Sequence, residues 1–158
     1  MGPELKSIID SLTSSVYRLT QLLDGFEGEF LYHSPAPDEW SIAQIVWHLG
    51  DVESRYRQRL ERIVAEDTPQ VPAVWPSPAP EPLPQVVNAL AVFEQERGKT
   101  IAKLTRLTPD AWQRGVQHAT LGSSTLKKQV QGLIDHDGEH LKQILRMMGR
   151  VEAGRLSD

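Results

Sequence analysis

Apolar residues recur along much of the chain at intervals of three and four positions, the spacing that places side chains on one face of an α-helix. The first stripe begins at Leu5 and ends at Asp24-Gly25, a pair that commonly terminates helices. Its members are Leu5, Ile8, Ile9, Leu12, Val16, Leu19, Leu22 and Leu23. The pattern predicts an amphipathic helix over residues 5–23.

A second helix is predicted by its start signal as well as by its stripe. Ser41 is followed three positions later by Gln44, the arrangement of a capping box, in which each side chain bonds the backbone N–H of the other residue. The apolar face that follows comprises Ile42, Ile45, Leu49, Val52, Tyr56, Leu60 and Ile63. We therefore expect a helix over residues 41–66, roughly 39 Å long at 1.5 Å per residue.

Two further stripes occupy the second half of the chain. The third helix is expected to end near Thr108-Pro109, and the fourth to start with a cap among residues 123–125 and to end near Arg150. The third stripe contains Val86, Val87, Leu90, Phe93, Ile101 and Leu104, and the fourth contains Leu126, Val130, Leu133, Ile144 and Met148. Four such stripes without strand-like alternation predict an all-α four-helix bundle. Residues 1–150 would form the single domain and residues 151–158 a C-terminal tail.

The connection between the second and third helices is rich in proline. Seven of the eleven prolines lie between Pro69 and Pro84, a composition that favours extended polyproline conformation. At about 3.1 Å per residue this segment covers roughly 50 Å, enough to return along the whole bundle. The second and third helices would then run parallel, in an up-down-down-up order. We expect a surface loop here, in preference to a roof formed by Trp75 over a functional site.

Composition narrows the chemistry that the protein can carry. None of the 158 residues is cysteine, so disulfides, thiolate nucleophiles and cysteine-bound zinc are excluded. No apolar run approaches the roughly 20 residues of a membrane span, and the N-terminus lacks the apolar region of a signal peptide. A net charge of −4 disfavours nucleic acid as a partner. We expect a cytoplasmic protein without membrane or nucleic-acid partners.

Three histidines fall on predicted apolar faces. His136 and His140 are four residues apart, so their rings lie on one side of the fourth helix, in line with Leu133 and Ile144. His48 lies at the edge of the apolar face of the second helix. Such residues are either ordinary core histidines, hydrogen-bonded to carbonyls or carboxylates, or ligands of a metal built into the bundle. Four nearby acids could serve as outer-shell acceptors or a fourth ligand, or form a solvated face: Asp51, Asp135, Asp137 and Glu139.

Two motifs resemble those of the DinB-like superfamily of metal-dependent enzymes. The first is Trp40-Ser41-Ile42-Ala43-Gln44-Ile45-Val46-Trp47-His48-Leu49, and the second is His136-x-x-x-His140-x-x-Gln143-Ile144, about ninety residues later. The resemblance spans nearly the whole chain. It implies an up-down-down-up bundle, often a homodimer, in which His48, His136 and His140 bind one divalent ion such as zinc or nickel. Many members have a further histidine where this chain has Glu139.

An open three-histidine site would allow several reactions. Three nitrogen ligands leave a coordination position free, as in catalytic zinc sites, so water or a small-molecule substrate could bind there. The resemblance implies either a hydrolase or a transferase that uses a low-molecular-weight thiol as cosubstrate. Asp51 and Glu139 are the candidate general bases. The alternative is a non-catalytic dimeric helical module that binds metal without turnover or uses the histidines structurally, in which Gly132 and Gly138 permit close helix contact.

Overall fold

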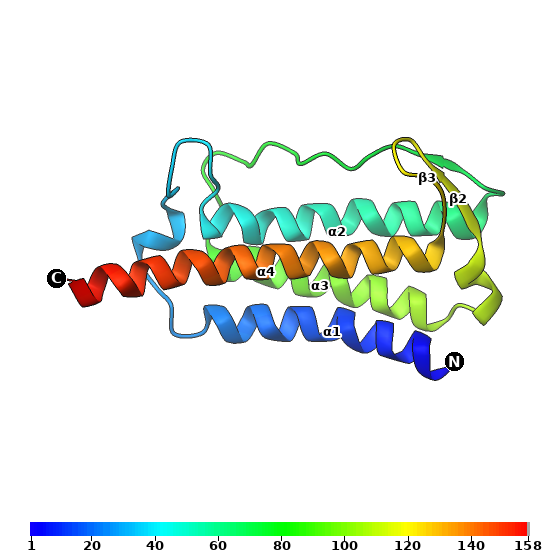
Figure 1. Ribbon diagram of the computed structural model, residues 1–158, viewed down its shortest axis with the longest axis horizontal. Helices are drawn as coiled ribbons and strands as arrows, with labels where there is room; N and C mark the ends of the chain where they lie inside the picture. Colours follow the sequence, from blue (N-terminus) through cyan, green and yellow to red (C-terminus); the bar gives the residue numbers. More distant parts are fainter. Residues whose placement is uncertain (158) are drawn as a thin grey trace.

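The computed structural model of the chain is a bundle of four long helices (Figure 1). The helices are α1 (Pro3–Leu23), α2 (Ile42–Ala65), α3 (Val86–Thr105) and α4 (Leu126–Ser157). The second and third run parallel to each other and opposite to the first and fourth, which confirms the predicted up-down-down-up order. The structure describes the backbone of residues 1–157 and the side chains of residues 1–152.

The start of α2 has the predicted capping box. The Gln44 backbone N–H donates to Ser41 Oγ at 3.1 Å, and the Ser41 backbone N–H donates to Gln44 Oε1 at 2.7 Å. Two N–H groups without intrahelical partners are thereby satisfied. This cap fixes the first turn of α2, and His48 lies on the second.

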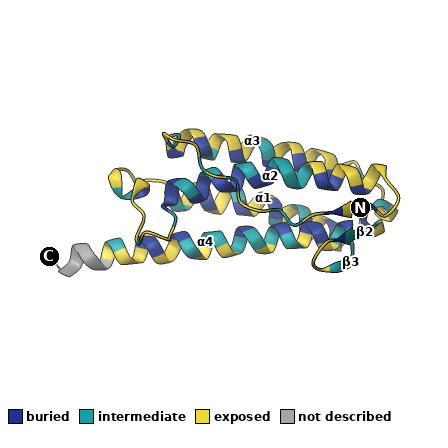
Figure 2. Ribbon diagram, turned by 90° about the horizontal axis from the view of Figure 1, so that it is seen from above, coloured by how far each residue is buried: buried dark blue, intermediate teal, exposed yellow. Residues whose placement is uncertain are grey.

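The inner faces of the helices are buried and form a core along the bundle, and their outer faces are exposed (Figure 2). The apolar stripes predicted for α1, α2 and α4 are buried or half-buried throughout. The prediction that Val87 lies on the apolar face of α3 is wrong, because 66% of this residue is exposed. It directly follows Val86, which is buried, and adjacent residues on a helix point about 100° apart.

A small three-stranded sheet at one end of the bundle was not predicted. It joins β1 (Gln70–Val71), β2 (Gly115–His118) and β3 (Gly122–Thr125), with β2 in the centre. The first pair is parallel and the second is an antiparallel hairpin. Strands of two to four residues are too short to show an alternating pattern. Next to the sheet, Trp112 lies in the short 3-10 helix after α3 and is fully buried.

Residues 72–84, here called the proline strap, return along the bundle beside α2 (Figure 1). Three arginines of α2 hold this connection through backbone carbonyls. Arg55 donates to Trp75 O at 2.6 Å, Arg59 donates to Pro72 O, and Arg62 donates to Gln70 O at 3.2 Å. These arginines lie on one face of α2, since they are spaced by four and three residues. The strap is therefore held at two of its residues, Pro72 and Trp75, by arginines in the C-terminal half of α2.

The fourth helix is longer than predicted. It continues to Ser157, past the expected end near Arg150, because the intervening sequence contains no proline and the helix passes through Gly154. The side chains of the expected tail lie outside the described residues from 153 onward. Within the part of the chain that the structure covers, no helix combines the length and apolar character that a membrane span requires.

A buried ion cluster connects all four helices. Arg97 of α3 is 1% exposed, and each of its five N–H groups meets an acceptor. Two bonds go to Glu53 of α2 (2.8 and 2.9 Å), two to Asp137 of α4 (2.8 and 3.0 Å) and one to Leu12 O of α1 (2.9 Å). Burial alone lowers the pKa of Arg97, but Asp137 and Glu53 together raise it well above its ordinary value. The guanidinium is therefore charged in the core.

Replacing Arg97 with methionine should destabilise the fold by about 3–5 kcal/mol, because two buried carboxylates would lose their cation. The free energy of unfolding from urea titrations measures this effect. Arg150→Met is the matched control, since Arg150 forms an exposed ion pair with Glu39 and its loss should leave the free energy of unfolding nearly unchanged. Equal effects of the two substitutions would contradict the structural role given to Arg97.

Candidate metal centre

The structure brings His48, His136 and His140 together in the core. The Nε2 atom of His136 is 3.1 Å from Nε2 of His48 and 3.2 Å from Nε2 of His140. One ring nitrogen of each histidine lies within 4.8 Å of one from each of the others. The pair on α4 converges because its members are one helical turn apart, and His48 reaches it from α2. A ring from α2 and two rings from α4 thus direct nitrogen atoms toward one place in the core.

Burial keeps these rings uncharged. The pKa of His48 is lowered to about 3, first by desolvation and then by His140 and His136. The nearby Asp51 raises it by a smaller amount. Desolvation also lowers the pKa of His136 to about 4, with contributions from His140 and Arg97. The pKa of His140 is lowered mainly by burial as well. At neutral pH all three rings therefore offer lone pairs in place of positive charges, as metal binding requires.

Hydrogen bonding among the rings alone does not explain this arrangement well. His136 Nε2 carries one hydrogen or one in-plane lone pair, yet it faces two other ring nitrogens. A tetrahedral ion with bonds of 2.0–2.1 Å to nitrogen would need ligand atoms about 3.3 Å apart, close to the two distances observed. The donor set and its spacing therefore fit a divalent cation.

One neighbouring side chain orients a ring for coordination. His140 Nδ1 lies 3.0 Å from Gln143 Oε1, and an amide oxygen can only accept, so Nδ1 carries the proton. The Nε2 lone pair of His140 is then free to face the other rings. Ligating histidines commonly have such an outer partner. Among the described residues, the Nδ1 atoms of His48 and His136 are buried without one.

An indole and a cavity adjoin the histidine cluster. The ring of Trp40 lies 4.8 Å from that of His48 and is stacked on that of His140, with 6.3 Å between ring centres. A cavity of about 280 Å³ opens beside His48 under the proline strap. Its walls are Trp40, Gln44, Trp47, His48, Pro76, Ser77, Pro78 and Ala79. The strap was expected to be a plain surface loop, but its residues 76–79 form one wall of this cavity, and Trp75 itself is mostly exposed.

The acidic residues singled out in the sequence lie outside the cluster. Asp51 forms an ion pair with Arg55 at 2.5 Å, and Glu139 is mostly exposed and pairs with Lys142 at 3.3 Å. Asp137 is buried against Arg97, and Asp135 is exposed. None of these four lines the cavity at His48. We therefore assign none of them a role as metal ligand or general base.

Sequence reasoning missed the partner of Asp137, although a signal was present. Arg97 is spaced four residues after Phe93 and three before Thr100, so a charged residue lies on the buried stripe of the third helix. Glu53 and Asp137 interrupt the stripes of α2 and α4 in the same way. Charges that fall on apolar faces of different helices must pair with one another or leave the core.

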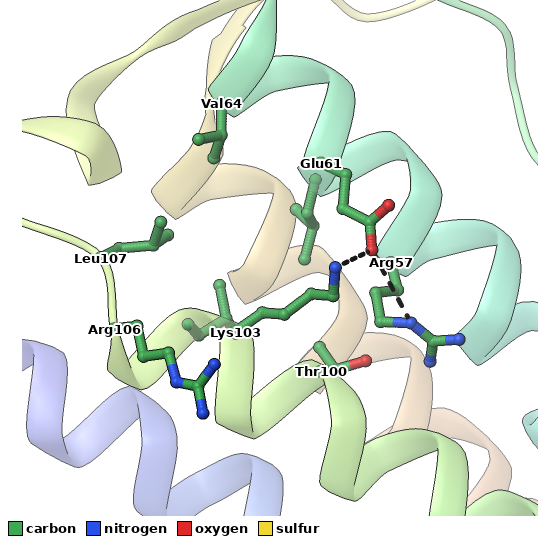
Figure 3. A pocket seen from close by; sticks show the side chains of 9 residues that line it. Arg57, Glu61, Val64, Thr100, Lys103, Arg106 and Leu107 are labelled. Carbon is green, nitrogen blue, oxygen red and sulfur yellow. Dashed lines mark ion pairs between the residues drawn. The ribbon is translucent and has the colours of Figure 1, made fainter.

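A second cavity, of about 260 Å³, lies between the C-terminal halves of α2 and α3 (Figure 3). Its floor is apolar, but charged groups surround it. Lys103 pairs with Glu61 at 2.5 Å, and Arg57 lies 4.0 Å from the same carboxylate. Its lining contains none of the three clustered histidines. The two cavities therefore differ in both charge and neighbouring chemistry.

Comparison with known proteins gives a family and a functional description of one relative. The family model of the DinB superfamily matches residues 11–144. A curated protein of Oceanobacillus iheyensis, whose name proposes a metal-dependent hydrolase, is 25% identical over 131 residues, which are 80% of this chain and 75% of that protein. The match to the family model includes all of α2 and α3, parts of α1 and α4, and all three clustered histidines.

Solved structures show the same fold. YfiT from Bacillus subtilis, described as a probable metal-dependent hydrolase with an unusual four-helix bundle topology, superposes with a TM-score of 0.80 at 21% identity, over 96% of this chain and 90% of that chain. A DinB-like protein from Bacillus cereus gives 0.69 at 15% identity, over 93% and 92% of the chains. At these identities the likeness shows the architecture alone.

The lowered histidine pKa values predict how the metal-free protein responds to acid. The unfolded chain binds protons on these rings below about pH 6.5, whereas folded His48 does so only near pH 3. Their contribution to stability is therefore complete above pH 6.5 and declines as the pH falls toward the folded values. Urea unfolding between pH 7 and pH 5 should show a falling free energy of unfolding.

His48→Gln should flatten this dependence by up to about 1.4 kcal/mol per pH unit, because one buried titrating ring is removed. The window above pH 5 avoids Glu66 and Glu96, whose pKa values are lowered and which lose their contribution only at more acidic pH. Parallel curves for the wild type and the variant would show that folding does not lower the pKa of His48.

Proposed function

Because the chain belongs to the DinB superfamily, we propose that His48, His136 and His140 bind one divalent metal ion and that the protein is a metal-dependent hydrolase. The observation that carries this proposal is the convergence of three neutral ring nitrogens beside a cavity. The names of the Oceanobacillus and Bacillus subtilis relatives support the hydrolytic reaction. Zinc and nickel are the ions we propose, since both accept imidazole nitrogen.

The residues at the site divide the work of binding and orientation. His48, His136 and His140 would hold the ion, Gln143 fixes the proton of His140 on Nδ1, and Trp40 packs against two of the rings. An ion bound by three neutral ligands would supply Lewis acidity and lower the pKa of a coordinated water to about 7. The cavity beside His48 gives a small-molecule substrate access to that position.

Protein purified without an affinity tag should contain close to one divalent ion per chain, measured by elemental mass spectrometry. His136→Ala should reduce the content at least tenfold, because His136 Nε2 faces both other ring nitrogens. His33→Ala is the control, since His33 lies on an exposed loop, and it should retain the metal. Equally negligible metal in all three proteins would remove the basis of the proposal.

Hydrolysis can be followed with small chromogenic esters such as 4-nitrophenyl acetate and 4-nitrophenyl butyrate. Chelator treatment or His48→Ala should lower kcat/KM by about 100-fold or more, since Lewis-acid activation contributes several kcal/mol. Adding zinc or nickel should restore the rate of the wild type but not that of the variant. An ester hydrolysis rate that is unaffected by the chelator would contradict metal-dependent catalysis on these substrates.

The thiol transferase implied by the family resemblance is the competing reaction. Its turnover would require a thiol cosubstrate and an electrophile, whereas hydrolysis requires only water. Assays with each electrophile in the presence and absence of a low-molecular-weight thiol separate the two reactions. Metal-dependent product that forms only when the thiol is present would replace hydrolysis by transfer at the same metal centre.

The alternative of an inert helical module receives little support from the glycines that suggested it. A Cβ atom added at Gly138 would meet nothing within 4 Å, and one at Gly132 would lie 3.7 Å from the Tyr56 hydroxyl. Within the described protomer, neither glycine serves a close contact between helices. The homodimer implied by the family resemblance stays a prediction, and the metal centre that we propose does not depend on it.

A further inference from the structure

The cavity beside His48 has a wall composition that restricts what can enter it. The indole of Trp40 comes from the segment just before α2 and that of Trp47 from α2 itself, and Pro76, Pro78 and Ala79 come from the proline strap. The remaining residues of the lining are His48, Gln44 and Ser77. Gln44 uses its Oε1 atom for the capping box. Five of the eight lining residues are thus aromatic or aliphatic, and polar groups share the surface with them.

No aspartate, glutamate, lysine or arginine lines this cavity. The nearest ion pair along α2, Asp51 with Arg55, lies outside the lining. The contrast with the other cavity is plain, because three cationic side chains and Glu61 surround that one (Figure 3). A charged group in the cavity at His48 would lose water without gaining a counter-ion, which is unfavourable.

The walls of the cavity are held in place before any ligand binds. Trp40 is stacked on His140, and it precedes the capped start of α2. On the opposite side, Arg55 holds Trp75 O at 2.6 Å while its own Nη2 donates to Asp51. This carbonyl directly precedes Pro76, the first strap residue of the lining. The binding surface is therefore preorganised, which lowers the entropic cost of binding.

We propose that this cavity binds an uncharged group of the substrate, about the size of one ring, next to the metal centre. Its volume of about 280 Å³ lies near the lower end of the roughly 300–1,000 Å³ of small-molecule sites, which suits part of a substrate. The substrate class is then a neutral ester or amide with a small aromatic or aliphatic group beside the reacting bond. This assignment rests on the proposed function for the reaction, whereas the cavity's preference for neutral groups does not.

Three probes of one shape test the preference for neutral groups. Benzyl alcohol, benzylammonium and benzoate would be titrated into the protein as purified and after chelator treatment, following the indole N–H resonances of Trp40 and Trp47. Chelator treatment removes direct coordination of benzoate to a metal. Benzyl alcohol should then bind at least about tenfold more tightly than either ion.

Two alanines of the strap provide matched variants, since both are half-buried and only one of them lines the cavity. Ala79→Leu fills the cavity and should weaken benzyl alcohol binding at least about tenfold, whereas Ala73→Leu changes a residue outside the lining and should alter binding less than about twofold. Ala79→Val, which fills less volume, should fall between them. Comparing the thermal unfolding of all three with that of the wild type checks that the strap remains folded.

Either charged probe binding as tightly as benzyl alcohol would overturn the proposal. Equal benzyl alcohol binding by the Ala79→Leu and Ala73→Leu proteins, or no saturable shift of either indole, would do the same. The titrations of chelator-treated protein involve neither turnover nor metal, so their failure would not contradict the proposed metal centre. Conversely, an absence of metal from the purified protein would refute the proposed function and leave the cavity's preference for neutral groups intact.

Discussion

The buried guanidinium of Arg97 is the interaction on which the geometry of the whole bundle depends. Five donors in a fixed plane are satisfied by groups from α1, α2 and α4, so the relative heights of all four helices are coupled at one point. Asp137, one acceptor, directly follows His136, and Glu53 is five residues after His48. The contacts that compensate these buried charges therefore also fix how α2 and α4 slide against each other. Convergence of the histidines follows from that register.

The charged cluster and the neutral cluster lie side by side but have opposite electrostatic character. The ion cluster concentrates one cation and two anions where each offsets the desolvation of the others. The histidine cluster has no such compensation at two of its rings: besides burial, His140 and Arg97 lower the pKa of His136, and His140 and His136 lower that of His48. Protonation of His48 and His136 is thus disfavoured by burial and by charge together, and protonation of His140 by burial. Three lone pairs are left facing one point, and a divalent cation could use all of them at once.

The parts of this structure that sequence predicted are those encoded by local spacing. The stripes of the four helices, the Ser41–Gln44 capping box and the pairing of His136 with His140 each depend on residues within a turn or two of one another. The three-stranded sheet, the partner of Asp137 and the wall formed by Pro76 depend on segments far apart in the chain. The position of Arg97 on an apolar stripe indicates that it needs a buried anionic partner, but it does not identify Glu53 or Asp137 as that partner. For His48 the spacing indicated only an inward position on another helix, and the family resemblance then implied that it shares one metal ion with the other two histidines.

The proline strap shows how topology and function are connected here. Two neighbouring parallel helices cannot be joined by a short turn, so the chain between α2 and α3 must return along the bundle. Proline makes this return extended and reduces the conformational entropy lost on folding, and the arginines of α2 fasten its carbonyls. Because the return ends near the start of α2, it must pass the turn that carries His48. The presence of a wall beside His48 therefore follows from the helix order. The chemical character of that wall is set by residues 76–79.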